Sequence, residues 1–190
     1  MIRTVVADAG PLIGLSRIGA LHLLAELFGR VVLTETVRAE LGFPPAAPNT
    51  LPNSAPFPYP GQELLAEAFR NGLLEAVQSP DATPGPPFRP LNPALDPGET
   101  SVIGLCLELR AQGHEVLLLI DDRAGRGEAR HQGIPITGTA AVIALACQSG
   151  RIPAARPLLE ALQREGYFLG DATIAAVLEQ VGEVPPSTTS

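Results

Sequence analysis

The sequence contains no lysine, and all 13 of its basic residues are arginines. The chain therefore cannot form a lysine Schiff base, and it lacks the lysine of a P-loop and that of a phospho-acceptor receiver site. The 20 acidic residues outnumber the arginines and give a formal net charge of −7, with a pI of about 4.9. A broad basic surface for double-stranded nucleic acid is therefore not expected.

Cysteine, histidine and long apolar runs are also scarce. The two cysteines, Cys106 and Cys147, lie in apolar contexts, and two isolated cysteines do not make a disulfide framework. Zinc ligation needs more well-placed cysteines and histidines than these. The N-terminal apolar run is too short for a signal peptide, and no run approaches the ~20 residues of a transmembrane helix. We expect a soluble protein of a reducing, cytoplasmic compartment.

Apolar periodicity predicts alternating strands and helices along most of the chain. The expected strands lie at 2–8, 30–34, 73–78 (an edge strand), 115–120 and 134–136. The expected helices lie at 11–28 (divided in two at Gly19), after Thr34 or Thr36, and at 61–71, 97–112, 124–132, 139–149, 154–165 and 171–182.

Proline dominates two stretches between these elements, at 42–60 and 79–93. Since proline excludes regular helix and central strand, we expect extended loops there, and long loops in a compact domain are usually functional or disordered. We predict a single domain over 1–184 with a Pro-rich insertion at about 43–93, followed by a disordered tail at 185–190.

Strands that alternate with helices predict a central parallel sheet with helices on both faces. Ligands of such sheets bind beyond the carboxyl ends of the strands. Asp8 ends the first strand, and Asp121 and Asp122 follow the strongest later one, so three carboxylates should converge at one edge. Converging carboxylates repel one another unless a cation neutralises them, and their hard oxygens suit Mg²⁺ or Mn²⁺. We therefore expect phosphodiester hydrolysis by metal-activated water, with Glu40 and Glu99 as further candidate acids.

Each of these acids also has an ordinary structural explanation. Asp8 and the 121–122 pair could each cap the helix that follows. The run DPGE at 96–99 fits a capping box, in which the aspartate is the N-cap and the glutamate is N3. Glu40 alone is typical of a solvated helix residue. The joint pattern, with acids at the ends of two strands, favours a shared site.

Three stretches carry a family resemblance: VVADAGPLIGLSRIGALHLLAELFGRVVLTETVRAEL, LDPGETSVIGLCLEL and VLLLIDDRAGRGEARHQGIPITGTAAVIALACQSGRI. In this order they resemble the PIN-domain superfamily, in particular the PIN-like branch that is related to VapC-type toxins and known as a domain of unknown function. The likeness spans about 3–182 apart from the Pro-rich 43–93. The ordered set of motifs carries it, since no single motif is specific.

The resemblance implies a three-layer α/β/α sandwich and a Mg²⁺- or Mn²⁺-dependent ribonuclease. It further implies RNA as the substrate, a homodimer and a possible antitoxin protein as partner. Position by position, it assigns the catalytic acids to Asp8, Glu40, Glu99 and Asp122. The metal ligands that it implies are Asp8, Glu99, Asp121 and Asp122. It also implies that Arg126, in the run DD-x-x-GR, and Thr139, in the GT before the next helix, contact the substrate.

The chain departs from the toxin pattern at three positions. Ala9-Gly10 follows the first acid, where toxins usually carry Ser, Thr or Asn, so a hydroxyl or amide that would orient a ligand is missing. Glu99 stands where most toxins have aspartate, and Ile120-Asp121-Asp122 replaces their Thr-x-Asp.

Three functional hypotheses remain open. The complete set of acids favours a metal-dependent ribonuclease, such as the toxin of a toxin–antitoxin pair. Ala9-Gly10 and the low pI favour a catalytically inactive PIN-like module that binds RNA or a protein partner. An unrelated α/β phosphatase is the third, although the haloacid-type site needs Asp-x-Asp after the first strand. A serine hydrolase is excluded because the chain has no G-x-S-x-G elbow.

The arginines at 123, 126 and 130 surround the second acidic cluster and share one face of the expected helix. They could form a small phosphate-contacting patch on an otherwise acidic protein. Alternatively, Arg126 pairs with the acids of the site while Arg123 and Arg130 are solvated.

Overall fold

The computed structural model describes residues 4–43, 59–78 and 88–183. The strands in these ranges are β1 (Thr4–Ala7), β2 (Val31–Thr34), β3 (Leu74–Val77), β4 (Val116–Leu119) and β5 (Ile136–Thr137). They form one parallel sheet in the order β3-β2-β1-β4-β5. The continuous apolar run of β4 is buried throughout, as a strand between two helical layers requires.

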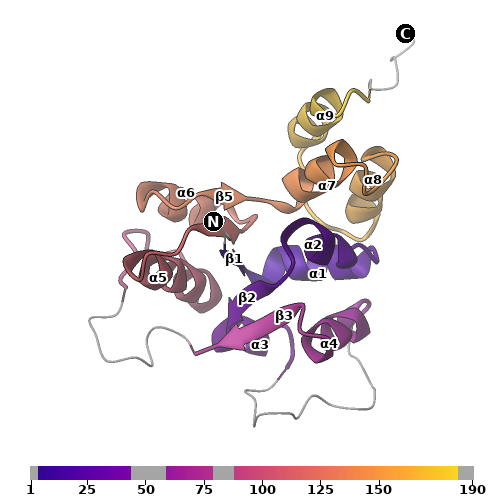
Figure 1. Cartoon of the computed structure of the whole chain (residues 1–190). Coiled ribbons are helices and arrows are strands. Elements are labelled where there is room, and N and C mark those ends of the chain that lie inside the picture. Colours follow the sequence, from indigo (N-terminus) through magenta and orange to yellow (C-terminus); the bar gives the residue numbers. More distant parts are fainter. Residues whose placement is uncertain (1–3, 44–58, 79–87, 184–190) are drawn as a thin grey trace.

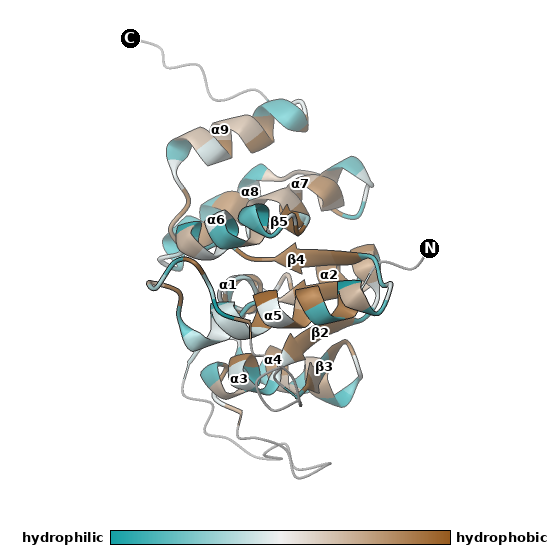
Figure 2. Ribbon diagram, turned by 90° about the vertical axis from the view of Figure 1, so that its left-hand side faces the viewer, coloured by the Kyte–Doolittle hydropathy of each residue, from teal (hydrophilic) through white to brown (hydrophobic). Residues whose placement is uncertain are grey.

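Helices cover both faces of this sheet (Figure 1). On one face, α5 (Pro97–Ala111) and α6 (Arg123–His131) pack on the strands, and α3 (Glu35–Glu40) packs against α5. The other face carries α1 (Ala9–Arg17), α2 (His22–Phe28), α4 (Gln62–Arg70) and α7 (Thr139–Gln148), with α8 (Arg156–Arg164) and α9 (Asp171–Gln180) beyond α7. The predicted α/β/α sandwich is thus confirmed. Figure 2 shows the strands as apolar, whereas α6 is largely hydrophilic.

Side-chain caps mark the starts of α3, α5 and α6. Thr34 caps α3, because its Oγ1 accepts a hydrogen bond from the Val37 N–H at 3.2 Å; Thr36 lies inside the helix. The fifth strand begins at Ile136 and not at Ile134 as predicted. Pro135 has no N–H to donate to the neighbouring strand β4, although its carbonyl accepts a hydrogen bond from the Leu118 N–H.

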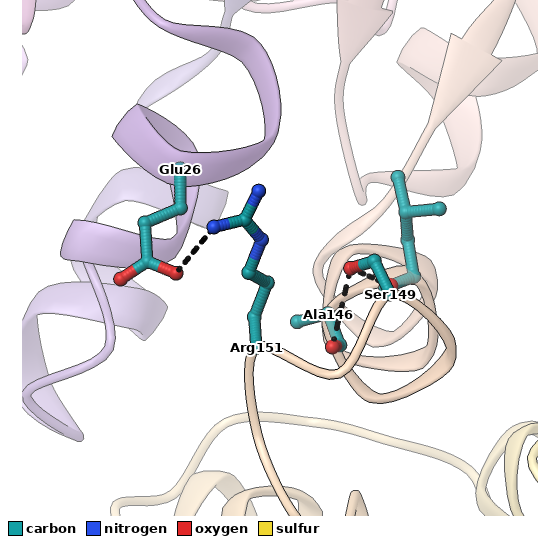
Figure 3. A network of polar contacts seen from close by, with 5 residues as sticks. Glu26, Ala146, Ser149 and Arg151 are labelled. Atoms are coloured by element: carbon teal, nitrogen blue, oxygen red, sulfur yellow. Dashed lines mark hydrogen bonds and ion pairs between the residues drawn. The ribbon is translucent and has the colours of Figure 1, made fainter.

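The helices α7, α8 and α9 enclose a second, smaller apolar cluster. Glu183 closes this part of the structure, because its carboxylate accepts the N–H groups of Ala155 and Arg156 at the start of α8. An ion pair of 3.9 Å joins Arg151, after α7, to Glu26 of α2 (Figure 3). Both of its side chains are at least one third exposed, so it contributes little to stability.

Residues 1–3, 44–58, 79–87 and 184–190 lie outside the described ranges, and with them parts of the predicted Pro-rich insertion and the predicted tail. Within the described ranges, no single helix combines the length and apolar composition needed to cross a membrane. Only α1 and α2 taken together meet those criteria, across a bend of 119°.

Candidate functional site

The candidate acids gather around the carboxyl ends of β1 and β4, which are neighbours in the sheet. Asp8 directly follows β1, and its N–H still bonds to the Leu119 carbonyl of β4 at 3.0 Å. Asp121 and Asp122 follow β4 after the buried Ile120. The backbone therefore brings these three acids to one edge of the sheet, as the sequence predicts.

Asp8 is 8% exposed and stands at the N-cap of α1, yet its side chain makes no capping hydrogen bond. Burial raises the pKa of its carboxyl group to about 7, and the negative charges of Asp96 and Glu40 add to this rise. The backbone N–H groups of Ala9 and Gly10 offset only part of it. The ionised form of Asp8 is therefore destabilised by burial and by neighbouring negative charges. A bound cation would stabilise this ionised form.

Glu40, in the last turn of α3, reaches the N-terminus of α5. A Cβ at Gly98 would lie 2.5 Å from either carboxylate oxygen of Glu40, so only glycine leaves room for this approach. Partial burial and the charge of Asp96 raise the pKa of Glu40, and the Gly98 N–H opposes them. Glu40 therefore belongs to the same acidic neighbourhood as Asp8.

The substitution Gly98→Ala tests whether Glu40 contributes to that neighbourhood. It should push the Glu40 carboxylate away at little cost in stability, because the displaced atoms end a flexible side chain and alanine favours a helix by about 0.5–1 kcal/mol over glycine. If Glu40 helps to hold a divalent ion, calorimetry will show weaker Mn²⁺ binding while the urea midpoint stays unchanged or rises. Gly127→Ala on α6 is the matched control, since its added Cβ meets nothing within 4 Å. Unchanged Mn²⁺ affinity in Gly98→Ala would remove Glu40 from the site.

The capping box predicted for 96–99 is confirmed. The Glu99 N–H donates to Asp96 Oδ1 at 2.7 Å, and the Asp96 N–H donates to Glu99 Oε2 at 3.1 Å. Glu99 nevertheless also faces Asp122. Burial and the hydrogen bond with Asp122 raise the pKa of Glu99 to about 7. Capping and membership of the acidic site are therefore compatible roles for this side chain.

Asp122 is the exposed member of that pair and the N-cap of α6. Its Oδ1 accepts the N–H groups of Ala124 and Gly125 at 2.6 and 3.2 Å. Burial pushes its pKa upward, but the hydrogen bonds from Glu99 and from these backbone groups outweigh it and leave the pKa below its usual value. Because the pKa of Asp122 is lowered and that of Glu99 is raised, Glu99 is the member of the pair that takes up a proton first as the pH falls.

Asp121 lies in a separate polar cluster. It accepts hydrogen bonds from the Thr139 N–H at 3.0 Å and from the hydroxyl groups of Thr139 and Tyr167, each at 2.5 Å. A Cβ at Gly138 would lie 2.5 Å from Asp121 Oδ1, so the chain approaches closely here. Three donors already compensate this carboxylate, and the fully buried Thr139 is one of its anchors.

Tyr167 is a residue of this neighbourhood that the sequence did not indicate. It lies between α8 and α9, and its ring covers Gly14 of α1, where a Cβ would come within 2.7 Å of the ring. Burial and the neighbouring Asp121 raise the pKa of its hydroxyl. No local pattern marks this role, because it depends on a contact between distant parts of the chain.

The arginines of α6 differ in their surroundings. Arg126 is half-buried and donates from Nη1 to the Ile120 carbonyl at 2.8 Å, while Arg123 and Arg130 are exposed. None of the three forms an ion pair within the described ranges. Of the two alternatives for Arg126, the ion pair with a site carboxylate is not formed within the described ranges, and the guanidinium group bonds to the backbone.

Over residues 4–43, 59–78 and 88–183, no three acidic, histidine or cysteine side chains are arranged to hold a metal ion together. The chemistry of the donors nevertheless fits a hard divalent cation. Asp8 and Glu99 are buried carboxyl groups with pKa values near 7, raised partly by other acids, and an added positive charge would reverse that effect. Asp8, Glu99 and Asp122 are the residues whose carboxyl groups could hold such an ion.

A family model described as PIN domain matches residues 4–183. The chain belongs to the PIN-domain family. No curated protein matches it. PIN domains have a nuclease-type fold, generally depend on divalent metals and often bind RNA, frequently within toxin–antitoxin pairs. The matched range includes both Pro-rich stretches.

Proposed function

We propose that this PIN domain is a Mg²⁺- or Mn²⁺-dependent ribonuclease that serves in the cytoplasm as the toxin of a toxin–antitoxin pair, as a homodimer. The observation that carries the proposal is the presence of two buried carboxyl groups with raised pKa values, Asp8 directly after β1 and Glu99 in the first turn of α5. Membership of the family supplies the expectation of metal dependence and of RNA as substrate.

The proposed roles follow from the contacts. Asp8, Glu99 and Asp122 would hold the divalent ion, which when bound supplies activated water and neutralises charge on the phosphate. Asp122 is already fixed by the N-terminus of α6. Loss of the proton shared by Glu99 and Asp122 would complete the charge of the site.

Other residues would support this set from outside. Glu40 lies over Gly98 and adds negative charge near Asp8. Asp121 is held by Thr139 and Tyr167, and it would fix the backbone that positions Asp122. Arg126, anchored on the Ile120 carbonyl, offers its remaining N–H groups to a phosphate.

An inactive module that binds RNA or a protein is the second candidate function. Ala9-Gly10 provides no side-chain hydroxyl or amide beside Asp8, and the described acids do not yet converge on one point. Such a module would retain the fold and lose the affinity for metal.

Calorimetric titration with Mn²⁺ distinguishes the two, and it should be made on the wild type, Asp8→Asn and Asp122→Asn. We expect binding to the wild type, and a loss of affinity and of RNA cleavage by about 100-fold or more in both variants. Asp171→Asn, which changes an exposed acid at the start of α9, is the control and should behave as wild type. If the wild type takes up no Mn²⁺, the inactive module is the better description.

A further inference from the structure

A buried hydrogen bond joins the two helices that carry Glu40 and Glu99. Thr34, at the N-cap of α3, and Ser101, in the second turn of α5, are separated by 67 residues in the chain. Their side-chain oxygen atoms lie 2.7 Å apart, and the two residues are 0% and 4% exposed. Since α3 ends at Glu40 and Glu99 lies in the first turn of α5, this bond links the elements that position both acids.

The direction of this bond follows from the protons available. The Ser101 hydroxyl donates its single proton to the Gly98 carbonyl at 2.7 Å, so the proton between the two hydroxyl groups belongs to Thr34. Thr34 in turn accepts from the Val37 N–H at 3.2 Å. Three hydrogen bonds thus run in one direction from α3 to the first turn of α5, and such bonds strengthen one another in a buried setting.

This chain of hydrogen bonds ends on a residue that Glu40 also contacts. The Gly98 carbonyl receives the Ser101 proton, and the Gly98 N–H interacts with the carboxylate of Glu40. That carboxylate is so close that an added Cβ on the glycine would lie 2.5 Å from either oxygen. Helix α3 is therefore attached to this glycine at both of its ends, by Glu40 directly and by Thr34 through Ser101. Glu99 is the next residue, so the same contacts hold the backbone that carries it.

Packing alone does not require a polar pair at this place. Valine and alanine would fill nearly the same volumes as Thr34 and Ser101. Replacing both partners of a buried hydrogen bond by apolar groups of similar shape can leave stability nearly unchanged. A hydrogen bond fixes a distance and a direction that an apolar contact leaves free. The pair therefore limits sliding of α3 along α5, which would separate Glu40 from Glu99.

We propose that Thr34 and Ser101 are positioning residues, which hold Glu40 and Glu99 in the arrangement that receives a divalent ion. The inference rests on the proposed function, in which Glu99 is a ligand and Glu40 adds negative charge. Neither hydroxyl would touch the ion, because both are buried and engaged in the chain of hydrogen bonds. Their effect passes through the backbone at Gly98, as groups behind the ligands of a metal site act through those ligands.

Mn²⁺ titration by calorimetry tests this role, with urea unfolding of the same variants in the absence of metal. Ser101→Ala breaks the chain of hydrogen bonds but leaves the Thr34 cap of α3 in place, and it should weaken Mn²⁺ binding by about 10-fold. Thr34→Val should do the same, whereas Thr34→Ser keeps the hydroxyl and should bind as the wild type does. Ser16→Ala is the matched control and should not change the affinity. The buried Ser16 also donates to a carbonyl three residues earlier, that of Ile13, at 2.9 Å, and this bond stays within α1.

The double variant Thr34→Val/Ser101→Ala separates positioning from stability. Either single change breaks the same link, so the double variant should bind Mn²⁺ no more weakly than Thr34→Val alone. Its urea midpoint should fall by less than the sum of the two single shifts, because Ser101→Ala by itself leaves the Thr34 proton buried without its acceptor. A purely structural role would not weaken Mn²⁺ binding while the midpoint partly recovers.

Three results would overturn the inference. If Ser101→Ala and Thr34→Val both bind Mn²⁺ as tightly as the wild type, the hydroxyl groups do not position the acids, and the ribonuclease proposal stands. If Ser16→Ala loses as much affinity as Ser101→Ala, the loss reflects a general loosening of the fold. If the wild type binds no Mn²⁺, the proposed function fails, and this inference fails with it.

Discussion

Asp8→Asn is expected to stabilise the metal-free protein by about 1–3 kcal/mol above about pH 8, and to change its stability little below about pH 4. Burial raises the pKa of Asp8 in the folded protein to about 7, from an ordinary value of 3.8. Between these values the unfolded chain releases the proton and the folded chain retains it, so stability falls as the pH rises. The loss is complete once the folded carboxyl group has also ionised, and asparagine removes it while remaining a good N-cap residue.

Urea unfolding at several pH values measures this effect. Asp171→Asn is the control, because its side chain is exposed, and its stability difference from wild type should be small. Added Mn²⁺ should raise the stability of the wild type and not that of Asp8→Asn. A stability difference for Asp8→Asn that does not grow with pH would show that Asp8 is not strained.

Tyr167→Phe is expected to cost about 1.5–3 kcal/mol of unfolding free energy, because the lost hydroxyl donates to a charged acceptor. It leaves Asp121 with the two donors of Thr139. Tyr59→Phe provides a matched comparison, since the Tyr59 hydroxyl donates to the neutral Leu41 carbonyl and should cost about 1 kcal/mol.

Urea unfolding of both tyrosine variants compares the two contacts, and hydrogen exchange adds a local readout. Faster exchange at 167–170 in Tyr167→Phe would show that the bond to Asp121 anchors the loop that carries Phe168. A cost equal to that of Tyr59→Phe, with unchanged exchange, would mean that the ring packing on Gly14 holds the loop by itself.

The sheet and its helices could be predicted from sequence because apolar periodicity is a local property. The acids at the ends of β1 and β4 could be predicted to approach one another because adjacent parallel strands end together. The capping box at 96–99 was predictable for the same local reason, since its partners are three residues apart.

The different contacts of Asp121 and Asp122 were not predictable. Consecutive residues leave a strand in opposite directions, so one faces Thr139 while the other caps α6 and faces Glu99. The side of the strand that faces Glu99 is set by the packing of α5, and the side that faces Tyr167 is set by the packing of the loop after α8. Tyr167 was missed because its partner precedes it by 46 residues and no motif joins them.

The pairing of β1 with β4 has a consequence for how the protein is made. Val5 pairs with Leu117 on one side and with Val31 on the other, so an N-terminal fragment that stops before β4 has β1 as an open edge. During synthesis this edge stays available to other chains until β4 leaves the ribosome, an interval that favours aggregation. The strand ends that carry Asp8 and Asp122 also come together only at that stage, so the candidate site is not assembled in a nascent chain until β4 has been translated.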